Sequence, residues 1–422
     1  MYLQRHLVLT PLVLCLLTAC SAGSGSDSET SHSFQVFEED GVTISESSSE
    51  PKYEGDIFTF EEIFELEQDE SRPETLLNVA AGYLMDEEGR IFVFDYGDCR
   101  IAVFNQNGKY LRDIGRQGAG PGEFSHIRYR WMKDGVIAVY DALQYRATTF
   151  TTEGMFLNSY TRPGTSNIMR LAPIMRRLMS IYPLPDGRMV QMLDEQRQFG
   201  TEEQARRSTA VLVSSAGDSL HSFSTEWMET PVYPARGGGV IGKRTMFTVV
   251  PALQVYLDRG ILIADPREPI ARWYDLEGNL TRILRLGLEP EPVTGEERTE
   301  IERYYRELIQ NSESPQKERL EENWQFTVIP DYKSFWYSFL VDDQGFHWLR
   351  NHDDWTQPAE VRRQYSYKVY SPEGEYLGSA TWPSRVASIT RGHFLGRQLD
   401  EETDGYRYFV YRITPAVEGL EY

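Results

Sequence analysis

Aspartate and arginine side chains recur at the ends of apolar runs in this sequence, where they could recognise a carboxylate, a sugar or a peptide segment. Asp95 is followed by Asp98 and Arg100, and Asp141 is followed by Arg146. A guanidinium group holds a carboxylate through two parallel hydrogen bonds. The alternative is that each Asp–Arg couple ties a loop to its neighbour. The candidate binding residues are Asp95, Asp98, Arg100, Arg116, His126, Asp141, Arg146, Asp265, Arg272, His352 and Arg363.

Short acidic or polar turns that end in glycine separate the apolar runs. Tight hairpin turns need a positive φ, which glycine adopts without the steric penalty of a Cβ. A first set of turns recurs along the chain, and a second set follows most of its members. The first set ends at Gly89, Gly135, Gly187, Gly260, Gly345 and Gly392, and the second at Gly108, Gly154, Gly217, Gly278 and Gly374.

Two hairpin turns in each unit predict four antiparallel strands, which is the blade of a β-propeller. In the first unit the strands cover 79–85, 90–95, 100–105 and 109–115. Apolar and polar residues alternate there, as expected of half-buried strands. The pattern predicts an all-β fold, a six-bladed β-propeller of four-stranded antiparallel blades, over residues 34–415.

The candidate binding residues are expected on one face of this propeller. The loops that join second to third strands, and blade to blade, share a face around the central channel, which is the usual ligand site. The glycine turns are expected at the opposite face. They are therefore not expected to take part in binding.

Two segments depart from the repeat. The last unit lacks a fourth strand, and residues 56–67, which precede the first unit, are expected to complete that blade and to remove an exposed edge. Between the fourth and fifth blades, residues 295–325 have the apolar spacing of helices. Thr294 and Glu297 match a capping box. We expect this helical insertion to cover one face, as structural cover or as a lid.

The N-terminus has the features of an export signal. Residues 1–19 combine Arg5 with an apolar run too short to span a bilayer. Leu17-Thr18-Ala19-Cys20 resembles the lipobox of bacterial lipoproteins, which implies lipidation (palmitate among the acyl groups) at Cys20. Residues 20–33 form a Gly/Ser-rich tether. Ser21 after the cysteine favours the outer membrane over the inner membrane, so we expect a lipid-anchored protein of the bacterial cell envelope.

Charge content bears on the partners of the protein, and cysteine content on whether disulfides stabilise it. The chain carries 43 Lys and Arg against 64 Asp and Glu, a net charge of −21. Nucleic-acid binding selects basic faces, so no nucleic-acid partner is expected. Cys99 would be the single cysteine left after removal of the signal and lipidation of Cys20, which excludes an intrachain disulfide. Stability must therefore come from burial and ring closure.

Residues 90–124 resemble the NHL-type repeat, in which a strand ending in Asp leads through a short polar loop to Arg-Ile and a glycine turn. The Gly-rich segment 115–124 is similar to the connector between blades in such repeats. Together with the lipobox, the chain resembles the bacterial six-bladed β-propeller lipoproteins. This resemblance implies the fold but no single activity.

Enzymes of NHL-like architecture include zinc-dependent amidating lyases, and related propeller lactonases use calcium. Only His126 and His352 are expected on the shared face, so three convergent histidines for zinc are not found and no metal site is assigned. Asp95, Asp141 and Asp265 could bind Ca²⁺, although an Asp at a strand end is equally a turn residue.

Two classes of function remain. The first hypothesis is an envelope-anchored binding or scaffold module for a protein, peptide or small ligand at the channel face, with the membrane as a partner through the N-terminal lipid. The alternative is a metal-dependent hydrolase or lyase with its ion in the central channel. No catalytic residue is assigned, because no concentrated catalytic signature is present.

Overall fold

The glycine turns join successive strands into antiparallel sheets. The computed structural model describes residues 31–161, 168–171, 174–184, 186–199, 203–234, 240–249, 251–358, 365–384, 388–399 and 405–422. All the glycines of both turn sets have positive φ, for example 76° at Gly89 and 98° at Gly374. In these parts of the chain no helix is both long and apolar enough to cross a membrane.

Three blades consist of four consecutive strands, each paired with the next. Blade one contains β4 (Ala80–Met85), β5 (Ile91–Asp95), β6 (Arg100–Phe104) and β7 (Tyr110–Ile114). Blade two contains β8 (Ile127–Lys133), β9 (Val136–Asp141), β10 (Arg146–Thr151) and β11 (Phe156–Thr161). Blade five contains β25 (Ser338–Val341), β26 (His347–Arg350), β27 (Tyr365–Tyr370) and β28 (Tyr376–Trp382).

Blade three is longer than the repeat predicts. Its strands are β12 (Ile168–Leu171), β13 (Ile174–Pro183), β14 (Met189–Phe199), β15 (Glu203–Val213), β16 (Ser219–Ser224), β17 (Met228–Pro234) and β18 (Val240–Gly242). The sequence predicts a polar loop over 196–207, but β14 and β15 stay paired as far as Phe199 and Glu203. Polar side chains on both faces of this extension give no hydrophobic period, so the sequence pattern missed it.

Blade four carries two extra strands at its outer edge. It is formed by β20 (Ala252–Tyr256), β21 (Gly260–Ala264), β22 (Ile270–Tyr274) and β23 (Leu280–Arg285). The hairpin of β1 (Phe34–Glu39) and β2 (Val42–Ser47) extends the sheet, because β2 pairs with β23 in parallel.

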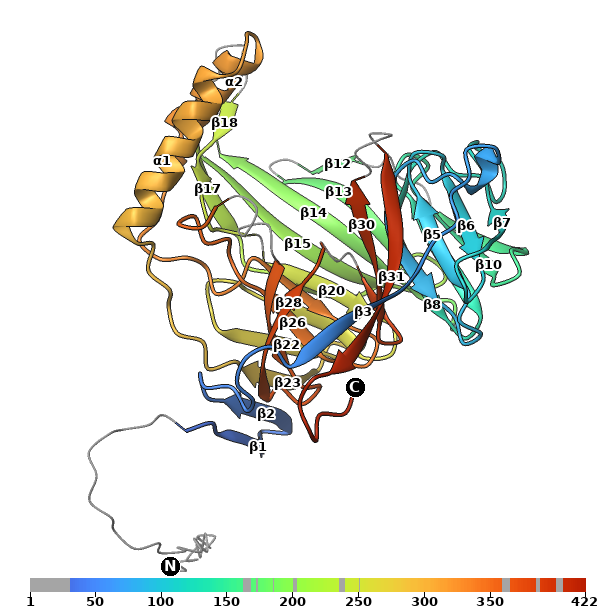
Figure 1. Ribbon diagram of the computed structural model, residues 1–422, viewed down its shortest axis with the longest axis horizontal. Coiled ribbons are helices and arrows are strands. Elements are labelled where there is room, and N and C mark those ends of the chain that lie inside the picture. Colours follow the sequence, from blue (N-terminus) through green and yellow to red (C-terminus); the bar gives the residue numbers. More distant parts are fainter. Residues whose placement is uncertain are drawn as a thin grey trace, which may run out of the picture. The chain divides into compact units, whose positions relative to one another are not determined.

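Blade six combines three strands near the C-terminus with one strand that precedes blade one. It contains β29 (Ile389–Thr390), β30 (His393–Leu399), β31 (Tyr406–Pro415) and β3 (Phe58–Glu65). The strand expected at 56–67 is β3, which pairs antiparallel with β31 from Phe58 and Pro415 to Glu65 and Phe409. Figure 1 shows the blue β3 beside the red β31.

The blades are held together by apolar cores that lie between them. All five residues of β5 are buried, which differs from the half-buried strands that the sequence predicts. Ile91 and Val93 belong to the core shared with blades five and six, whereas Phe92 and Phe94 belong to the core shared with blade two. A middle strand of a blade therefore buries both of its faces, one against each neighbouring blade.

The predicted helical insertion between blades four and five is confirmed. It consists of α1 (Gly295–Gln310) and α2 (Gln316–Gln325), and the capping box of Thr294 and Glu297 is formed. Phe326, after α2, stacks on Tyr233 of β17 with ring centroids 4.4 Å apart. The short strand β24 (Thr327–Val328), which follows Phe326, pairs in parallel with β19 (Arg244–Thr245). The segment that follows α2 thus contacts β17 and β19, and Figure 1 shows the two helices near β17 and β18. A 3₁₀ helix, η1 (Pro73–Thr75), precedes β4.

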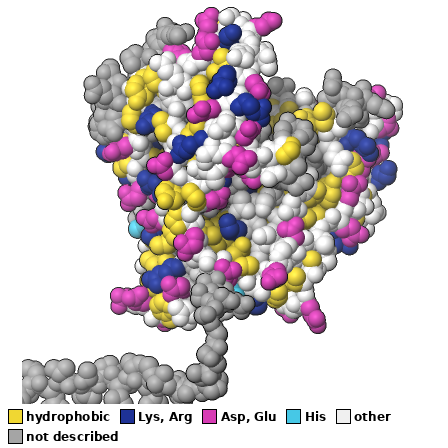
Figure 2. Space-filling model, turned by 60° about the vertical axis from the view of Figure 1, so that its left-hand side comes forward, with side chains coloured by type: hydrophobic (Ala, Val, Ile, Leu, Met, Phe, Trp, Pro, Cys, Tyr) yellow, Lys and Arg dark blue, Asp and Glu magenta, His cyan; other side chains and the backbone are white. Residues whose placement is uncertain are grey.

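The net negative charge does not form one continuous field on the face seen in Figure 2. Acidic and basic side chains are interspersed there, with apolar side chains between them. This pattern matches the many exposed ion pairs, such as that of Arg303 with Glu307 on α1.

Candidate functional site

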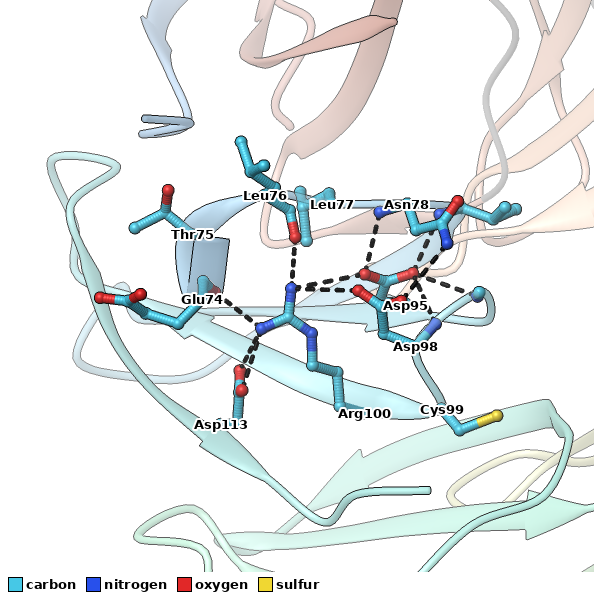
Figure 3. A network of polar contacts seen from close by, with 12 residues as sticks. Glu74, Thr75, Leu76, Leu77, Asn78, Asp95, Asp98, Cys99, Arg100 and Asp113 are labelled. Carbon is cyan, nitrogen blue, oxygen red and sulfur yellow. Dashed lines mark hydrogen bonds and ion pairs between the residues drawn. The ribbon is translucent and has the colours of Figure 1, made fainter. Parts of the chain in front are cut away.

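The predicted residues of blade one form a joint between the loop and the sheet (Figure 3). The carboxylate of Asp95 is fully buried and accepts backbone N–H groups of Asn78 at 3.0 Å and Val79 at 2.9 Å. Arg100 donates from Nη1 to Asp113 at 2.9 Å and to the carbonyl of Glu74 at 2.7 Å. Asp98 lies 3.6 Å from Arg100. These contacts anchor the segment that enters the innermost strand.

The equivalent residues of blade two are used in the same way. Asp141 accepts backbone N–H groups of Leu143 and Gln144, both at 2.9 Å. Arg146 donates to the carbonyls of Gly120 at 2.9 Å and Glu123 at 2.8 Å. The Gly-rich connector is therefore held by an arginine of the following blade.

The other predicted residues lie apart from one another in local pairs. Asp265 accepts a hydrogen bond from Nε of Arg267 at 2.9 Å. Burial alone would raise the pKa of Asp265, but its hydrogen bonds with Arg267 outweigh burial and lower the pKa. Exposed pairs join Arg116 to Glu123 at 2.8 Å and Arg272 to Glu268 at 3.2 Å.

Neither predicted histidine reaches the channel cavity described below. The ring of His126 lies 6.4 Å from that of Tyr96, measured between centroids. Nε2 of His352 lies 2.9 Å from the hydroxyl of Ser334, and burial lowers the pKa of His352 to about 4. Arg363 lies outside the described residues.

A cavity of about 1150 Å³ lies where the innermost strands of the six blades face one another. None of the ten predicted binding residues that the structure describes lines it. The physical reason is that buried carboxylate and guanidinium groups need partners, and here each finds one in its own loop or in the adjoining connector. The described residues of the expected binding face therefore bond mainly to other groups of the protein, and their role in ligand binding stays a prediction.

The innermost strands contribute mainly apolar side chains to the walls of the cavity, whereas the turns and strands β14 and β15 contribute charged ones. Every blade contributes from its innermost strand, with Leu84 on β4, Met132 on β8, Met179 on β13, Val341 on β25 and Ile389 on β29 among the lining residues. Trp131, Tyr182, Gln254 and Tyr256 add aromatic and polar groups. A large, mostly apolar pocket with a few polar groups is the usual form of a small-ligand site.

The first set of glycine turns also contributes to the cavity, contrary to the expectation that these turns lie away from any ligand. Lining residues come from the turns at 86–88, 134–135, 258–259, 342–343 and 391. Oδ2 of Asp343 accepts the backbone N–H of Arg391 at 2.7 Å. Asp343 is partly accessible to solvent. Many protein atoms nevertheless surround its carboxylate, and this burial raises the pKa of Asp343.

Most arginines that line the cavity have a carboxylate partner. Their closest contacts are Arg90 with Asp86 at 2.6 Å, Arg206 with Asp194 at 3.2 Å, Arg207 with Glu195 at 2.5 Å, Arg259 with Asp258 at 3.4 Å and Arg391 with Glu87 at 3.3 Å. Arg130 is the exception, because among the described residues no ion pair joins it to a carboxylate.

Arg130 was not among the predicted binding residues. Arg130 lies in β8, which also carries Arg128 and Lys133, so residue type alone does not single it out as a channel residue. Nη1 of Arg130 donates to the hydroxyl of Tyr96 at 3.4 Å, and its guanidinium lies 5.3 Å from the ring centroid of Phe94. Burial lowers the pKa of Arg130.

The described residues contain no group of three or more His, Cys, Asp or Glu side chains placed to hold a metal ion. The three carboxylates considered for Ca²⁺ are each bonded within their own blade. Asp95 and Asp141 take backbone N–H groups, and Asp265 takes Arg267. They do not converge on one point.

Comparison with known proteins supports the architecture. A family model described as a six-bladed beta-propeller, DUF5128, matches residues 73–170. The fold is a six-bladed β-propeller. No curated protein matches the chain.

Two solved structures of Bacteroides proteins cover most of this propeller. A putative exported protein of Bacteroides fragilis is 11% identical, covering 86% of this chain and 96% of its own, with a TM-score of 0.46. A member of the DUF4221 family from Bacteroides vulgatus is 10% identical, covering 86% and 99%, with a TM-score of 0.43. A gluconolactonase from Xanthomonas campestris is 9% identical, covering 80% and 88%, with a TM-score of 0.36. At these values none of them carries an argument about activity.

Proposed function

We propose that this propeller is a lipid-anchored protein of the bacterial cell envelope that binds a small ligand or a peptide segment in its central channel. The observation that carries the proposal is the cavity of about 1150 Å³ between the innermost strands. Apolar side chains of the innermost strands and convergent polar and charged groups line it together, as in many ligand sites. Most of the described candidate residues of the sequence pattern, by contrast, already bond to other groups of the protein.

The binding site is tested by filling the channel. Met179 lines the cavity, so Met179→Trp should obstruct it. Met155 is 63% exposed and does not line the cavity, so Met155→Trp is the matched control. Native mass spectrometry of protein incubated with envelope extract should show a bound small molecule on the wild type and on Met155→Trp, but not on Met179→Trp. Equal occupancy of all three proteins, or no bound mass on any, would contradict channel binding.

Anchoring rests on the sequence of residues 1–33, with Cys20 as the lipidated residue after cleavage of 1–19. The Cys20→Ser variant should lose incorporation of labelled palmitate and move from the membrane fraction to the soluble fraction. Fractionation of inner from outer membranes tests the expected outer-membrane location. If Cys20→Ser stays in the membrane fraction to the same extent as the wild type, lipidation does not hold the protein there.

The alternative, a metal-dependent hydrolase or lyase, needs ligand groups that converge in the channel. The described carboxylates and histidines do not converge in that way. Elemental analysis of untagged protein for Ca²⁺ and Zn²⁺, with melting curves before and after a chelator, separates the two functions. Stoichiometric metal and a melting temperature lowered by chelation would favour the enzyme.

A further inference from the structure

The guanidinium of Arg130 fits against Gly82, which has no side chain to occupy that volume. A Cβ added to Gly82 of β4 would lie 1.5 Å from Nη2 of Arg130, so the guanidinium occupies the volume that any other residue at position 82 would need. The ring of Phe94 lies 5.3 Å away, and the hydroxyl of Tyr96 accepts from Nη1. The guanidinium is therefore held between blades one and two, beside the cavity that Arg130 lines.

The hydrogen bonding of this guanidinium is incomplete. A guanidinium has five N–H donors. Among the described residues, Nε of Arg130 is buried without a partner, and the guanidinium makes one hydrogen bond, to the hydroxyl of Tyr96. Removing a cation from water without a counter-charge is strongly unfavourable. The other arginines that line the cavity avoid this cost by pairing with carboxylates. Arg130 retains a charge that an anion entering from the cavity could pair with.

The surroundings of Arg130 define the rest of the ligand. Leu84 and Met132 line the cavity with it, and Met179 and Met192 line it from blade three. Methionine side chains adapt to apolar groups of different shapes. Among cavity-lining residues of the innermost strands, Lys133 at the last position of β8 is the other charged one in the described chain. A ligand with one anionic group and an apolar body fits this combination.

We propose that the channel binds an amphipathic carboxylate, whose head group pairs with Arg130 and whose apolar body lies against Leu84, Met132 and Met179. This proposal rests on the proposed function and names the chemical class of the ligand. A guanidinium pairs with a carboxylate or a phosphate through two parallel hydrogen bonds, so the single charge of the carboxylate decides between them. The acidic turns that line the cavity, including Glu87, Glu88 and Asp343, disfavour a multiply charged anion.

The class is tested with three probes that share a ten-carbon chain: decanoate, decanol and decyltrimethylammonium. Binding to the purified full-length protein is measured by titration calorimetry below micelle-forming concentrations, with the fluorescence of Trp131 as a second readout, since Trp131 lines the cavity. Decanoate should bind tightest. Arg130→Met should weaken decanoate by roughly 10- to 100-fold and leave decanol unchanged, because it removes a charge-assisted hydrogen-bonded pair.

Arg128→Met is the matched control, because Arg128 lies on the same strand but is exposed and does not line the cavity. It should bind decanoate as the wild type does. Gly82→Ala keeps the charge but displaces the guanidinium, so it should also weaken decanoate. Without ligand, the melting temperature of Arg130→Met should equal or exceed that of the wild type, because an unpaired cation has been removed.

Several outcomes would overturn the proposal. If decanol binds as tightly as decanoate, the channel takes apolar ligands without a carboxylate, and channel binding itself stands. If decyltrimethylammonium binds tightest, the acidic turns and not Arg130 select the ligand. If no probe binds while the channel-filling test shows a bound molecule, the ligand belongs to another class. A melting temperature of Arg130→Met well below that of the wild type would make Arg130 a structural residue.

Discussion

The hydroxyl of Tyr422 donates a hydrogen bond to Oδ2 of Asp342, 3.0 Å away. Asp342 is 2% exposed and opens the first glycine turn of blade five. It also accepts the N–H of Gly345 at 2.8 Å and of Phe346 at 2.9 Å, and Nε1 of Trp348 at 2.8 Å. The segment after β31 is thus fastened to a turn that contributes to the cavity lining.

Tyr422→Phe should destabilise the fold by about 1–3 kcal/mol, because it leaves a buried carboxylate without one of its donors. The ring still packs on Phe58 and Phe346, so the loss isolates the hydroxyl. Urea denaturation followed by tryptophan fluorescence measures it. Tyr332→Phe, at a site 59% exposed, should change stability by less than about 0.5 kcal/mol. If Tyr422→Phe and Tyr332→Phe changed the free energy of unfolding equally, the hydrogen bond of Tyr422 to Asp342 would not stabilise the fold.

Phe58→Ala should destabilise the protein by about 3–5 kcal/mol, the usual cost of truncating a buried aromatic ring. Phe58 is 3% exposed, and its ring centroid lies 5.2 Å from that of Trp348. It belongs to β3, so its loss should also weaken the pairing that completes blade six. Val36→Ala on β1, at 50% exposure, is the control. A loss below about 1 kcal/mol for Phe58→Ala would show that β3 contributes little to stability.

Asp95→Asn should lower stability by about 1–3 kcal/mol while leaving ligand binding unchanged. The carboxylate accepts N–H groups from the segment before β4, but it does not line the cavity. Chemical denaturation and decanoate titration of the same variant separate the two effects. Asp98→Asn, at an exposed position, should alter neither quantity strongly. Loss of decanoate binding in a fully folded Asp95→Asn protein would restore Asp95 as a binding residue.

His347 should make the protein less stable in mild acid. Burial lowers the pKa of His347 to about 4 from its usual 6.5. As pH falls from 6.5 toward 4, His347 therefore binds a proton in the unfolded chain but not in the folded chain. The free energy of unfolding then decreases by up to about 1.4 kcal/mol per pH unit. Above pH 6.5 His347 is neutral in both states, so its contribution to the free energy of unfolding no longer changes with pH.

His347→Gln tests this pH dependence. Other groups, including Asp342, Asp343 and His352, titrate in both proteins and cancel in the difference. The stability advantage of the wild type over His347→Gln should therefore shrink between pH 6.5 and 4, as measured by urea denaturation at several pH values. An advantage that stays constant across this range would show that His347 does not titrate as inferred.

Much of the fold followed from local sequence features. The turn glycines, such as Gly89 and Gly374, marked the hairpins because a positive φ is a property of one residue and its neighbours. The capping box of Thr294 and Glu297 marked the start of α1 for the same reason. The extension of β14 and β15 was missed because its polar residues carry no local period.

The site could be predicted far less well. Asp95 and Arg100 were recognised as a pair, but the sequence left open whether they bind a ligand or a loop, because that depends on which partners are near. The structure places the N–H groups of Asn78 and Val79 at the carboxylate. Arg130 shows the converse, since only the structure reveals that no carboxylate among the described residues pairs with it.

The sequence by itself determined the number of blades, the helical insertion between blades four and five, and the net negative charge of the chain. These follow from turn conformation, hydrophobic period and composition, which are local or additive. Only the tertiary structure decided that first-turn residues line the cavity and that Arg130 lies over Gly82. Burial and charge pairing depend on atoms from different blades, and their distances are set by how the blades pack.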